Sequence, residues 1–182
     1  MVAPGLRVGW ISTCHTGLHT CLVRTTQGSV QGSSSLSQVL LNSLFRQWHP
    51  THGLHAHLQR LQASYAARCV ALCAAAEKHL GPSRASWLVP AAGMFLWLRL
   101  TCATGHASGV VDTETELQHL LGQYKVAAVP GARFSAQPIR SPYLRLSFAS
   151  ASDAQFEAGM ERLAQLLDHA DAEAKKSKVR SC

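Results

Sequence analysis

The stretch Val89-Pro90-Ala91-Ala92-Gly93-Met94-Phe95-Leu96-Trp97-Leu98-Arg99-Leu100 decides the fold of this 182-residue chain. It is the most apolar run in the sequence, and Pro90 and Gly93 near its start favour a turn. A short apolar run bounded by turn residues is typical of a buried strand. Because proline has no N–H to donate to a ladder, Pro90 belongs at the entry of that strand. We therefore predict a central strand over residues 94–100.

Length and composition favour one folded domain with a core. The chain is long enough to bury a core, and its 47% of hydrophobic residues argues against global disorder. No run approaches the roughly 18 apolar residues that a membrane span needs, so no membrane partner is expected. No signal peptide or Arg-rich presequence is visible at Met1. We expect a cytoplasmic or mitochondrial location, with no targeting segment in this chain.

The charge balance gives little support for a nucleic-acid partner. The formal charge is +7, but four basic residues lie in the last eight positions. Without those four, 13 basic residues face 10 acidic ones, whereas a nucleic-acid binder carries a basic stripe on a folded face. We expect residues 175–182 to be a basic, disordered tail and the chain to bind no nucleic acid.

Cysteine and histidine spacing does not predict a disulfide framework or a metal site. The six cysteines are irregularly spaced, which favours a reducing compartment. Two groups of residues could be read as metal ligands, but neither has the paired spacing of a structural zinc site. They are Cys14, His15, His19 and Cys21, and His49, His52, His55 and His57.

The first 53 residues contain too few elements to close a core of their own. A short strand is expected over residues 7–11, a loop with a weak amphipathic helix over 12–34, and a helix from Ser35 that Pro50 ends. One strand and one helix cannot bury their own apolar faces. We therefore interpret residues 1–53 as the remnant of a larger domain.

A long helix follows. Apolar residues recur every three or four positions until Gly81-Pro82 ends the pattern, which predicts a connecting helix of about seven turns over residues 54–82. The recurring positions are Leu54, Leu58, Leu61, Tyr65, Cys69, Leu72 and Ala76.

Residues 83–174 alternate between strands and helices. The expected strands are 87–89, 94–100, 126–129 and 143–148. Two capping boxes, Thr113-x-x-Glu116 and Ser152-x-x-Gln155, predict helices over 113–121 and 153–170. This order predicts a small α+β domain whose helices cover one side of the sheet.

Four segments in this order resemble one family. The segments are Ala3-Pro4-Gly5-Leu6-Arg7-Val8-Gly9-Trp10, Val89 to Leu100, Val129-Pro130-Gly131-x-x-Phe134 and Ser141-Pro142-Tyr143-Leu144-Arg145-Leu146-Ser147-Phe148. Together they resemble the C-terminal half of the class I/II aminotransferases, the fold type I enzymes that use pyridoxal 5'-phosphate (PLP). Within the family they look most like the members that act on kynurenine and 2-aminoadipate. The likeness extends to about Ala170 and implies an α/β fold.

The resemblance implies roles for two arginines. Arg7, in the Pro-Gly-Leu-Arg segment, would bind the PLP phosphate, and the rigid guanidinium fork suits a phosphate. Arg145, in the Leu-Arg-x-Ser-Phe segment, would bind the α-carboxylate of the substrate. Arg99, Arg133 and Arg140 match no family motif and are expected to be structural.

The resemblance also implies that one catalytic residue is absent. In the family, the Schiff-base lysine precedes the phosphate-binding arginine by seven positions, which here falls directly before Met1. Neither Lys78 nor Lys125 stands at an equivalent place. We therefore expect no catalytic residue in this chain and no activity from it alone.

Three functions remain open from the sequence. The first is an aminotransferase, homodimeric in its full-length form, that moves an amino group from an L-amino acid such as kynurenine or 2-aminoadipate to 2-oxoglutarate. The second is a non-catalytic small-domain protein that binds a partner or a carboxylate ligand. The third is a PLP-dependent lyase or the effector domain of a PLP-binding transcription regulator, because fold does not determine reaction class. An isolated half-domain would expose apolar surface at Ile11, Leu36, Val39, Leu40 and Leu54.

Overall fold

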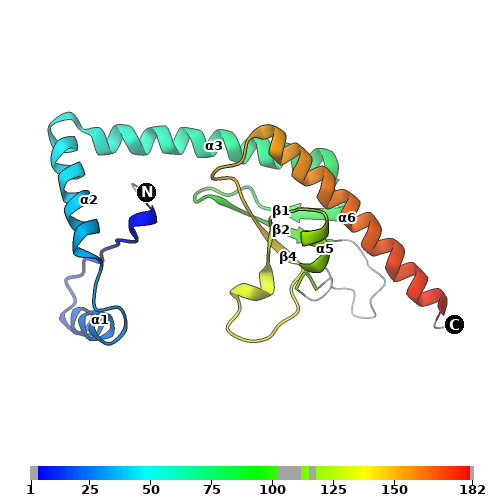
Figure 1. Cartoon of the computed structure of the whole chain (residues 1–182), viewed down its shortest axis with the longest axis horizontal. Coiled ribbons are helices and arrows are strands. Elements are labelled where there is room, and N and C mark those ends of the chain that lie inside the picture. The colour runs from blue at the N-terminus through cyan, green and yellow to red at the C-terminus, as the bar shows by residue number, and fades with distance from the viewer. Residues whose placement is uncertain (1–3, 102–111, 115–117, 181–182) are drawn as a thin grey trace. The chain divides into compact units, whose positions relative to one another are not determined.

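A computed structural model describes residues 4–101, 112–114 and 118–180 (Figure 1). The chain divides into two compact units, unit 1 over Met1–Gln62 and unit 2 over Ala63–Cys182. The long helix predicted from the sequence is present as α3 (Gly53–His79), which contributes residues to both units.

Unit 1 is helical in the part that the structure describes. It contains η1 (Pro4–Leu6), α1 (Thr16–Ser29), α2 (Ser35–Trp48), η2 (His49–Thr51) and the first turns of α3. His15 caps α1, because its Nδ1 accepts a hydrogen bond of 3.0 Å from the N–H of Leu18. The helix predicted from Ser35 is confirmed.

The strand predicted over residues 7–11 is wrong, since this segment is irregular. A strand needs a neighbour to pair its backbone groups. Among the described residues of unit 1 no other strand is present to supply one.

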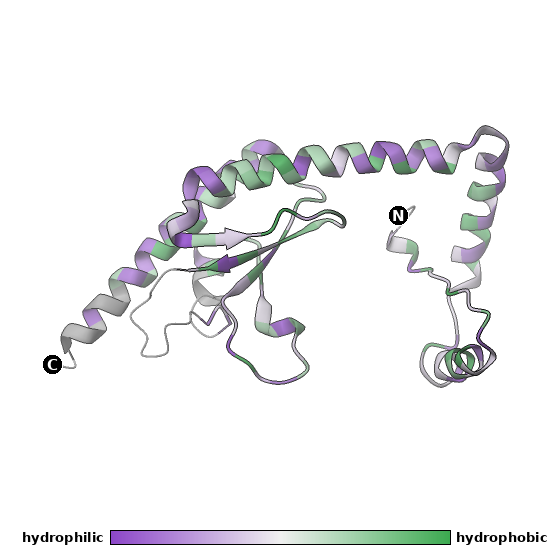
Figure 2. Cartoon of the chain, turned by 180° about the vertical axis from the view of Figure 1, so that it is seen from behind, coloured by the Kyte–Doolittle hydropathy of each residue, from purple (hydrophilic) through white to green (hydrophobic). Residues whose placement is uncertain are grey.

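Unit 1 leaves most of its apolar side chains exposed. Among its described residues only Leu41 is buried. The exposure predicted for five apolar side chains is confirmed, and Figure 2 shows hydrophobic residues along α2. Their exposed fractions are Ile11 72%, Leu36 68%, Val39 60%, Leu40 50% and Leu54 38%.

Unit 2 is built on an antiparallel sheet. Its described strands are β1 (Ala85–Trp87), β2 (Phe95–Leu100), β3 (Val129–Pro130) and β4 (Tyr143–Ser147), in the order β1-β2-β4-β3. The register of the central pair places Phe95 opposite Ser147 and Trp97 opposite Arg145. The prediction of a central strand paired with the segment near 143–148 is confirmed.

The two faces of the sheet differ sharply. Leu96, Leu98 and Leu100 of β2 are buried, whereas Phe95, Trp97 and Arg99 between them are exposed. The leucine face packs against α3 and α6 (Asp153–Arg180), which lie on the same side of the sheet (Figure 1). The helix residues in this core include Cys69, Leu72, Ala75, Ala76, Phe156, Met160, Leu163, Leu166 and Leu167. One sheet face is therefore core and the other is open.

The capping box predicted at the start of α6 is confirmed. The N–H of Ser152 donates to Gln155 Oε1 at 2.8 Å, and the N–H of Gln155 lies 3.4 Å from Ser152 Oγ. The helix continues to Arg180, so residues 175–180 are helical rather than a disordered tail. Cations near a helix C-terminus interact favourably with the helix dipole. Residues 181–182 lie outside the described residues.

The other predicted capping box, Thr113-x-x-Glu116, stays a prediction, because its second residue is not among the described residues. The hydroxyl of Thr113 is buried and donates to backbone carbonyl oxygens of Ser141 (3.0 Å) and Tyr143 (2.9 Å). Glu116 lies outside the described residues, and the helix α5 spans Gln118–Gln123. The strand predicted over 126–129 is shorter and later, at Val129–Pro130.

Polar contacts join α3 and the short α4 (Gly81–Arg84) to α6. Lys78 Nζ and His79 Nε2 each lie 2.8 Å from Glu157 Oε2, and Arg84 donates to Asp168 at 2.7 Å. None of the described helices is long and apolar enough to cross a membrane.

We expect Glu157→Gln to destabilise unit 2 in a pH-dependent manner. Hydrogen bonds with Lys78 and then His79 hold the pKa of Glu157 below its ordinary value. Because the folded pKa is the lower one, the stabilisation is complete above the unfolded pKa of about 4.3 and disappears as pH falls through the folded pKa. Urea unfolding followed by circular dichroism should show a lower free energy of unfolding for the variant than for the wild type at pH 7. This difference should become smaller below about pH 4.3. A loss in the free energy of unfolding that does not change with pH would contradict this prediction, and so would an equal loss in Glu161→Gln.

We expect Gly131→Ala to destabilise unit 2 by about 1–3 kcal/mol. A Cβ at Gly131 would clash with Ser141 Oγ and lie 2.8 Å from Tyr143 Cβ and 3.0 Å from the Tyr143 carbonyl oxygen. The matched control is Gly159→Ala in α6, where a Cβ meets nothing within 4 Å and alanine is the better helix former. Equal free energies of unfolding for the two variants would show that the position of Gly131 can accommodate a Cβ atom without destabilising unit 2.

Candidate functional site

The candidate site lies on the open face of the sheet in unit 2, where β4 presents Arg145. Its neighbours in the strand, Leu144 and Leu146, are buried in the core, so the alternation of the strand places Arg145 on the opposite face. The guanidinium carbon of Arg145 lies 4.1 Å from the ring centroid of Phe95 and 4.4 Å from that of Phe134. The side chain is half-buried.

Four aromatic rings, Phe95, Trp97, Phe134 and Tyr143, form what we call the aromatic platform. Trp97 meets Phe134 edge to face with centroids 5.1 Å apart, and it meets Tyr143 in the same way at 6.2 Å. Contacts between a guanidinium and ring faces contribute about 0.5–2 kcal/mol and restrict the orientation of the guanidinium plane. The platform therefore holds Arg145 in a defined place.

The fork of Arg145 has no acidic partner among the described residues. Its guanidinium carbon lies over two rings, and a guanidinium can donate two parallel hydrogen bonds to a carboxylate along one edge. The arrangement suits a planar carboxylate that accepts two parallel hydrogen bonds.

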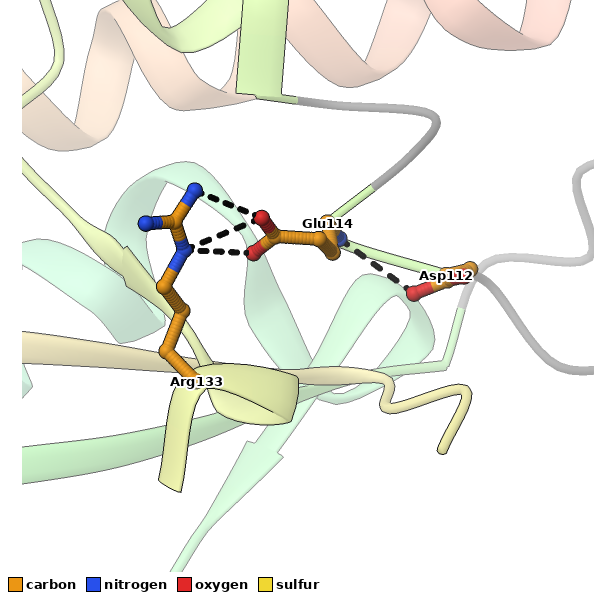
Figure 3. Close-up of polar contacts among 3 residues, drawn as sticks. All are labelled: Asp112, Glu114 and Arg133. Atoms are coloured by element: carbon orange, nitrogen blue, oxygen red, sulfur yellow. Dashed lines mark hydrogen bonds and ion pairs between the residues drawn. The ribbon is translucent and has the colours of Figure 1, made fainter. Parts of the chain in front are cut away.

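A second arginine fixes the segment that carries Phe134. Arg133, in η3 (Gly131–Phe134), donates through Nε and Nη2 to both carboxylate oxygens of Glu114, at 2.6–3.0 Å (Figure 3). The N–H of Glu114 in turn donates to Asp112 Oδ1 at 3.3 Å. Hydrogen bonds with Glu114 raise the pKa of Arg133 above its ordinary value. Arg133 is structural, as predicted.

Arg7 lies in unit 1, directly after the turn η1. Its side chain is exposed, and its backbone adopts a left-handed conformation with φ of 55°. The N–H of Arg7 donates to the Pro4 carbonyl oxygen at 3.2 Å, which closes the turn. No acidic side chain pairs with Arg7 among the described residues. Non-glycine residues with positive φ are uncommon and occur often at functional sites.

Other reactive side chains offer little chemistry in the part of the chain that the structure describes. No group of three or more His, Cys, Asp or Glu side chains there is placed to hold a metal ion. Burial and the neighbouring Cys69 raise the pKa of Cys73 to about 11, so this thiol stays protonated at neutral pH and is a poor nucleophile. Lys78 is paired with Glu157.

The aromatic platform is the part of the site that the sequence analysis did not predict. The alternation of side chains along β2 could have placed Phe95 and Trp97 together on one face of the sheet. Phe134 belongs to the motif Val129-Pro130-Gly131-x-x-Phe134. Neither the alternation nor the motif indicates that β2 and η3 both contact Arg145. That contact depends on the pairing of β2 with β4 and on the path of η3.

Comparisons with known proteins agree on one family. Residues 1–163 match the family described as aminotransferase class I and II. A mitochondrial kynurenine/alpha-aminoadipate aminotransferase of Bos taurus is 34% identical over 170 residues, which is 92% of this chain and 37% of the bovine protein. An aromatic amino acid aminotransferase of Schizosaccharomyces pombe, C569.07, is also 34% identical over 169 residues, or 89% of this chain and 35% of its own length.

A solved structure shows the same fold. The alpha-aminoadipate aminotransferase LysN of Thermus thermophilus, in complex with N-(5'-phosphopyridoxyl)-L-leucine, aligns with a TM-score of 0.75 and 26% identity. The alignment covers 93% of this chain and 40% of LysN. The predicted α/β fold of fold type I and the PLP-dependent family are thereby confirmed. This chain spans a little over a third of the length of these relatives, and it belongs to the class I and II aminotransferase family.

Proposed function

We propose that this chain forms the C-terminal part of a PLP-dependent aminotransferase. The enzyme moves an amino group from an L-amino acid such as kynurenine or 2-aminoadipate to 2-oxoglutarate. The observation that carries the proposal is the half-buried Arg145, which lies over the rings of Phe95 and Phe134 and has no acidic partner among the described residues. The substrate class is supported by the bovine relative, whose name includes kynurenine and alpha-aminoadipate, and by LysN of T. thermophilus, whose name includes alpha-aminoadipate.

In this proposal Arg145 binds the α-carboxylate of the amino acid. Two parallel hydrogen bonds from the guanidinium fix the direction of the carboxylate, and therefore the direction of the Cα–H bond. The aromatic platform excludes water from one side of the ion pair, which strengthens the electrostatic attraction. A 2-oxo acid carries the same carboxylate group, so one arginine serves both half-reactions.

Arg7 binds the phosphate of the cofactor in this proposal. Its exposed guanidinium carries a permanent positive charge and matches the geometry of a phosphate group. When bound, PLP withdraws electrons from the substrate Cα and so weakens the Cα–H bond. The division into a large-domain remnant, a connecting helix and a small domain remains part of the proposal, as does a homodimeric assembly in the cytoplasm or in mitochondria.

The main alternative is a non-catalytic protein that binds a partner or a carboxylate ligand. The exposed apolar side chains of unit 1 would then be covered by that partner. We favour the aminotransferase, because a protein with no PLP has no physical need for both a phosphate-binding Arg7 and a carboxylate-binding Arg145.

We expect Arg145→Gln to reduce kcat/KM by a factor of about 30 to several thousand in a full-length polypeptide that contains this chain. The loss of a charge-assisted bidentate contact corresponds to about 2–5 kcal/mol. The melting temperature should barely change. Arg162→Gln removes the same charge from the exposed surface of α6 and is the matched control. Unchanged kinetics in Arg145→Gln would reduce this residue to a structural role.

We expect residues 1–182 alone to form no covalent link with PLP and to show no aminotransferase activity. No lysine in this sequence stands at the place that the family uses. The test is to mix the chain with PLP, reduce it with borohydride and search for modified peptides by mass spectrometry. Stoichiometric modification of one lysine, lost when that lysine is replaced, would show that the site has been misassigned.

A further inference from the structure

A second arginine lies on the open face of the sheet, and the proposed function does not use it. Arg99 is exposed near the end of β2, two residues beyond Trp97, with Ser86 opposite it on β1 and Tyr143 opposite it on β4. Within the described part of the chain no acidic side chain pairs with Arg99. Its positive charge is therefore available to a ligand.

Arg99 lies at the edge of a cleft of about 590 Å³. The lining includes Phe95 and Trp97 from β2, Tyr143 from β4, and Val89 and Met94 from the segment before β2. This volume is within the range of small-molecule sites, which are typically apolar with a few polar groups that fix orientation. Arg145 does not line this cleft.

The composition of the lining restricts the ligand. Arg99 is the one charged side chain among the lining residues, all of which belong to the described part of unit 2. A single cation matches one carboxylate better than a polyphosphate. The exposed rings of Trp97 and Tyr143, each 40% exposed, offer surfaces on which a planar aromatic body can pack. The serine and tyrosine hydroxyl groups beside Arg99 can add hydrogen bonds to the same carboxylate.

We propose that this cleft binds a small aromatic monocarboxylate, with the carboxylate on Arg99 and the ring against Trp97. The carboxylate position at Arg99 differs from the one at Arg145, although the cleft shares Phe95, Trp97 and Tyr143 with the aromatic platform. The inference does not rest on the proposed function. It involves binding only and no chemical step.

The test uses indole-3-acetate as the probe and the 182-residue chain as the protein. Isothermal titration calorimetry and ligand-observed NMR should show saturable binding with one site per chain. Arg99→Gln should weaken this binding by about 10- to 100-fold, because a hydrogen bond to a charged group is lost. Arg162→Gln, which removes the same charge on α6, should change the affinity by less than about twofold. Circular dichroism would verify that each variant keeps its fold.

Two further measurements distinguish carboxylate binding at Arg99 from binding that does not depend on the charge or that occurs at Arg145. Indole-3-acetamide, which keeps the ring and lacks the charge, should bind as weakly as the acid binds to Arg99→Gln. Arg99→Lys keeps the charge without the fork and should give an intermediate affinity. Absence of saturable binding to the wild-type chain would overturn the proposal, and so would binding that Arg145→Gln abolishes and Arg99→Gln leaves intact. That second result would place the acid at Arg145 and would support the proposed function instead.

Discussion

The register between β2 and β4 is the constraint on which the rest of unit 2 depends. It pairs Leu96 with Leu146 and Leu98 with Leu144 on the face that α3 and α6 cover, and it pairs Trp97 with Arg145 on the other face. Because side chains alternate along a strand, a slip of one residue would turn Arg145 into the core. A buried charge without a partner costs several kcal/mol. The same register therefore determines both the core and the site.

Much of the fold could be predicted from the sequence, because the signals for it are local. The apolar alternation at 94–100, the periodicity before Gly81 and the capping box at Ser152 each depend on a few neighbouring residues. Thr113 makes a contact that such local reasoning does not predict. Its hydroxyl is used by the carbonyl groups of Ser141 and Tyr143, about thirty positions away, and buried carbonyl groups require a donor. The strand expected at 7–11 is wrong, because a strand needs a second strand to pair with.

The site could be predicted only in part. The family motif indicates Arg145 and Arg7, whereas the aromatic platform and the surroundings of the other arginines need the structure. Arg133 and Arg99 have the same side chain and no motif, yet Arg133 is paired with Glu114 and Arg99 lies in a cleft with no described acidic partner. The two arginines differ in which distant segment of the chain lies next to each of them. A pattern of neighbouring residues in the sequence does not predict such a contact.

The two units differ in how well they bury their apolar side chains, and this difference bears on function. Unit 2 encloses a contiguous core that includes Leu98, Leu144 and Leu163, whereas the described part of unit 1 buries only Leu41. Each fully buried aliphatic side chain contributes about 1.5–3 kcal/mol, so unit 1 gains little stability from its own side chains. Its helices need further surface to pack against. Under the proposed function, a large cofactor-binding domain would supply that surface, together with further groups around the phosphate that Arg7 is proposed to bind. The same helices on a non-catalytic protein would need a separate partner and would leave Arg7 without a role. The exposed apolar surface and the two arginines are therefore the observations that support the proposed function over the non-catalytic alternative.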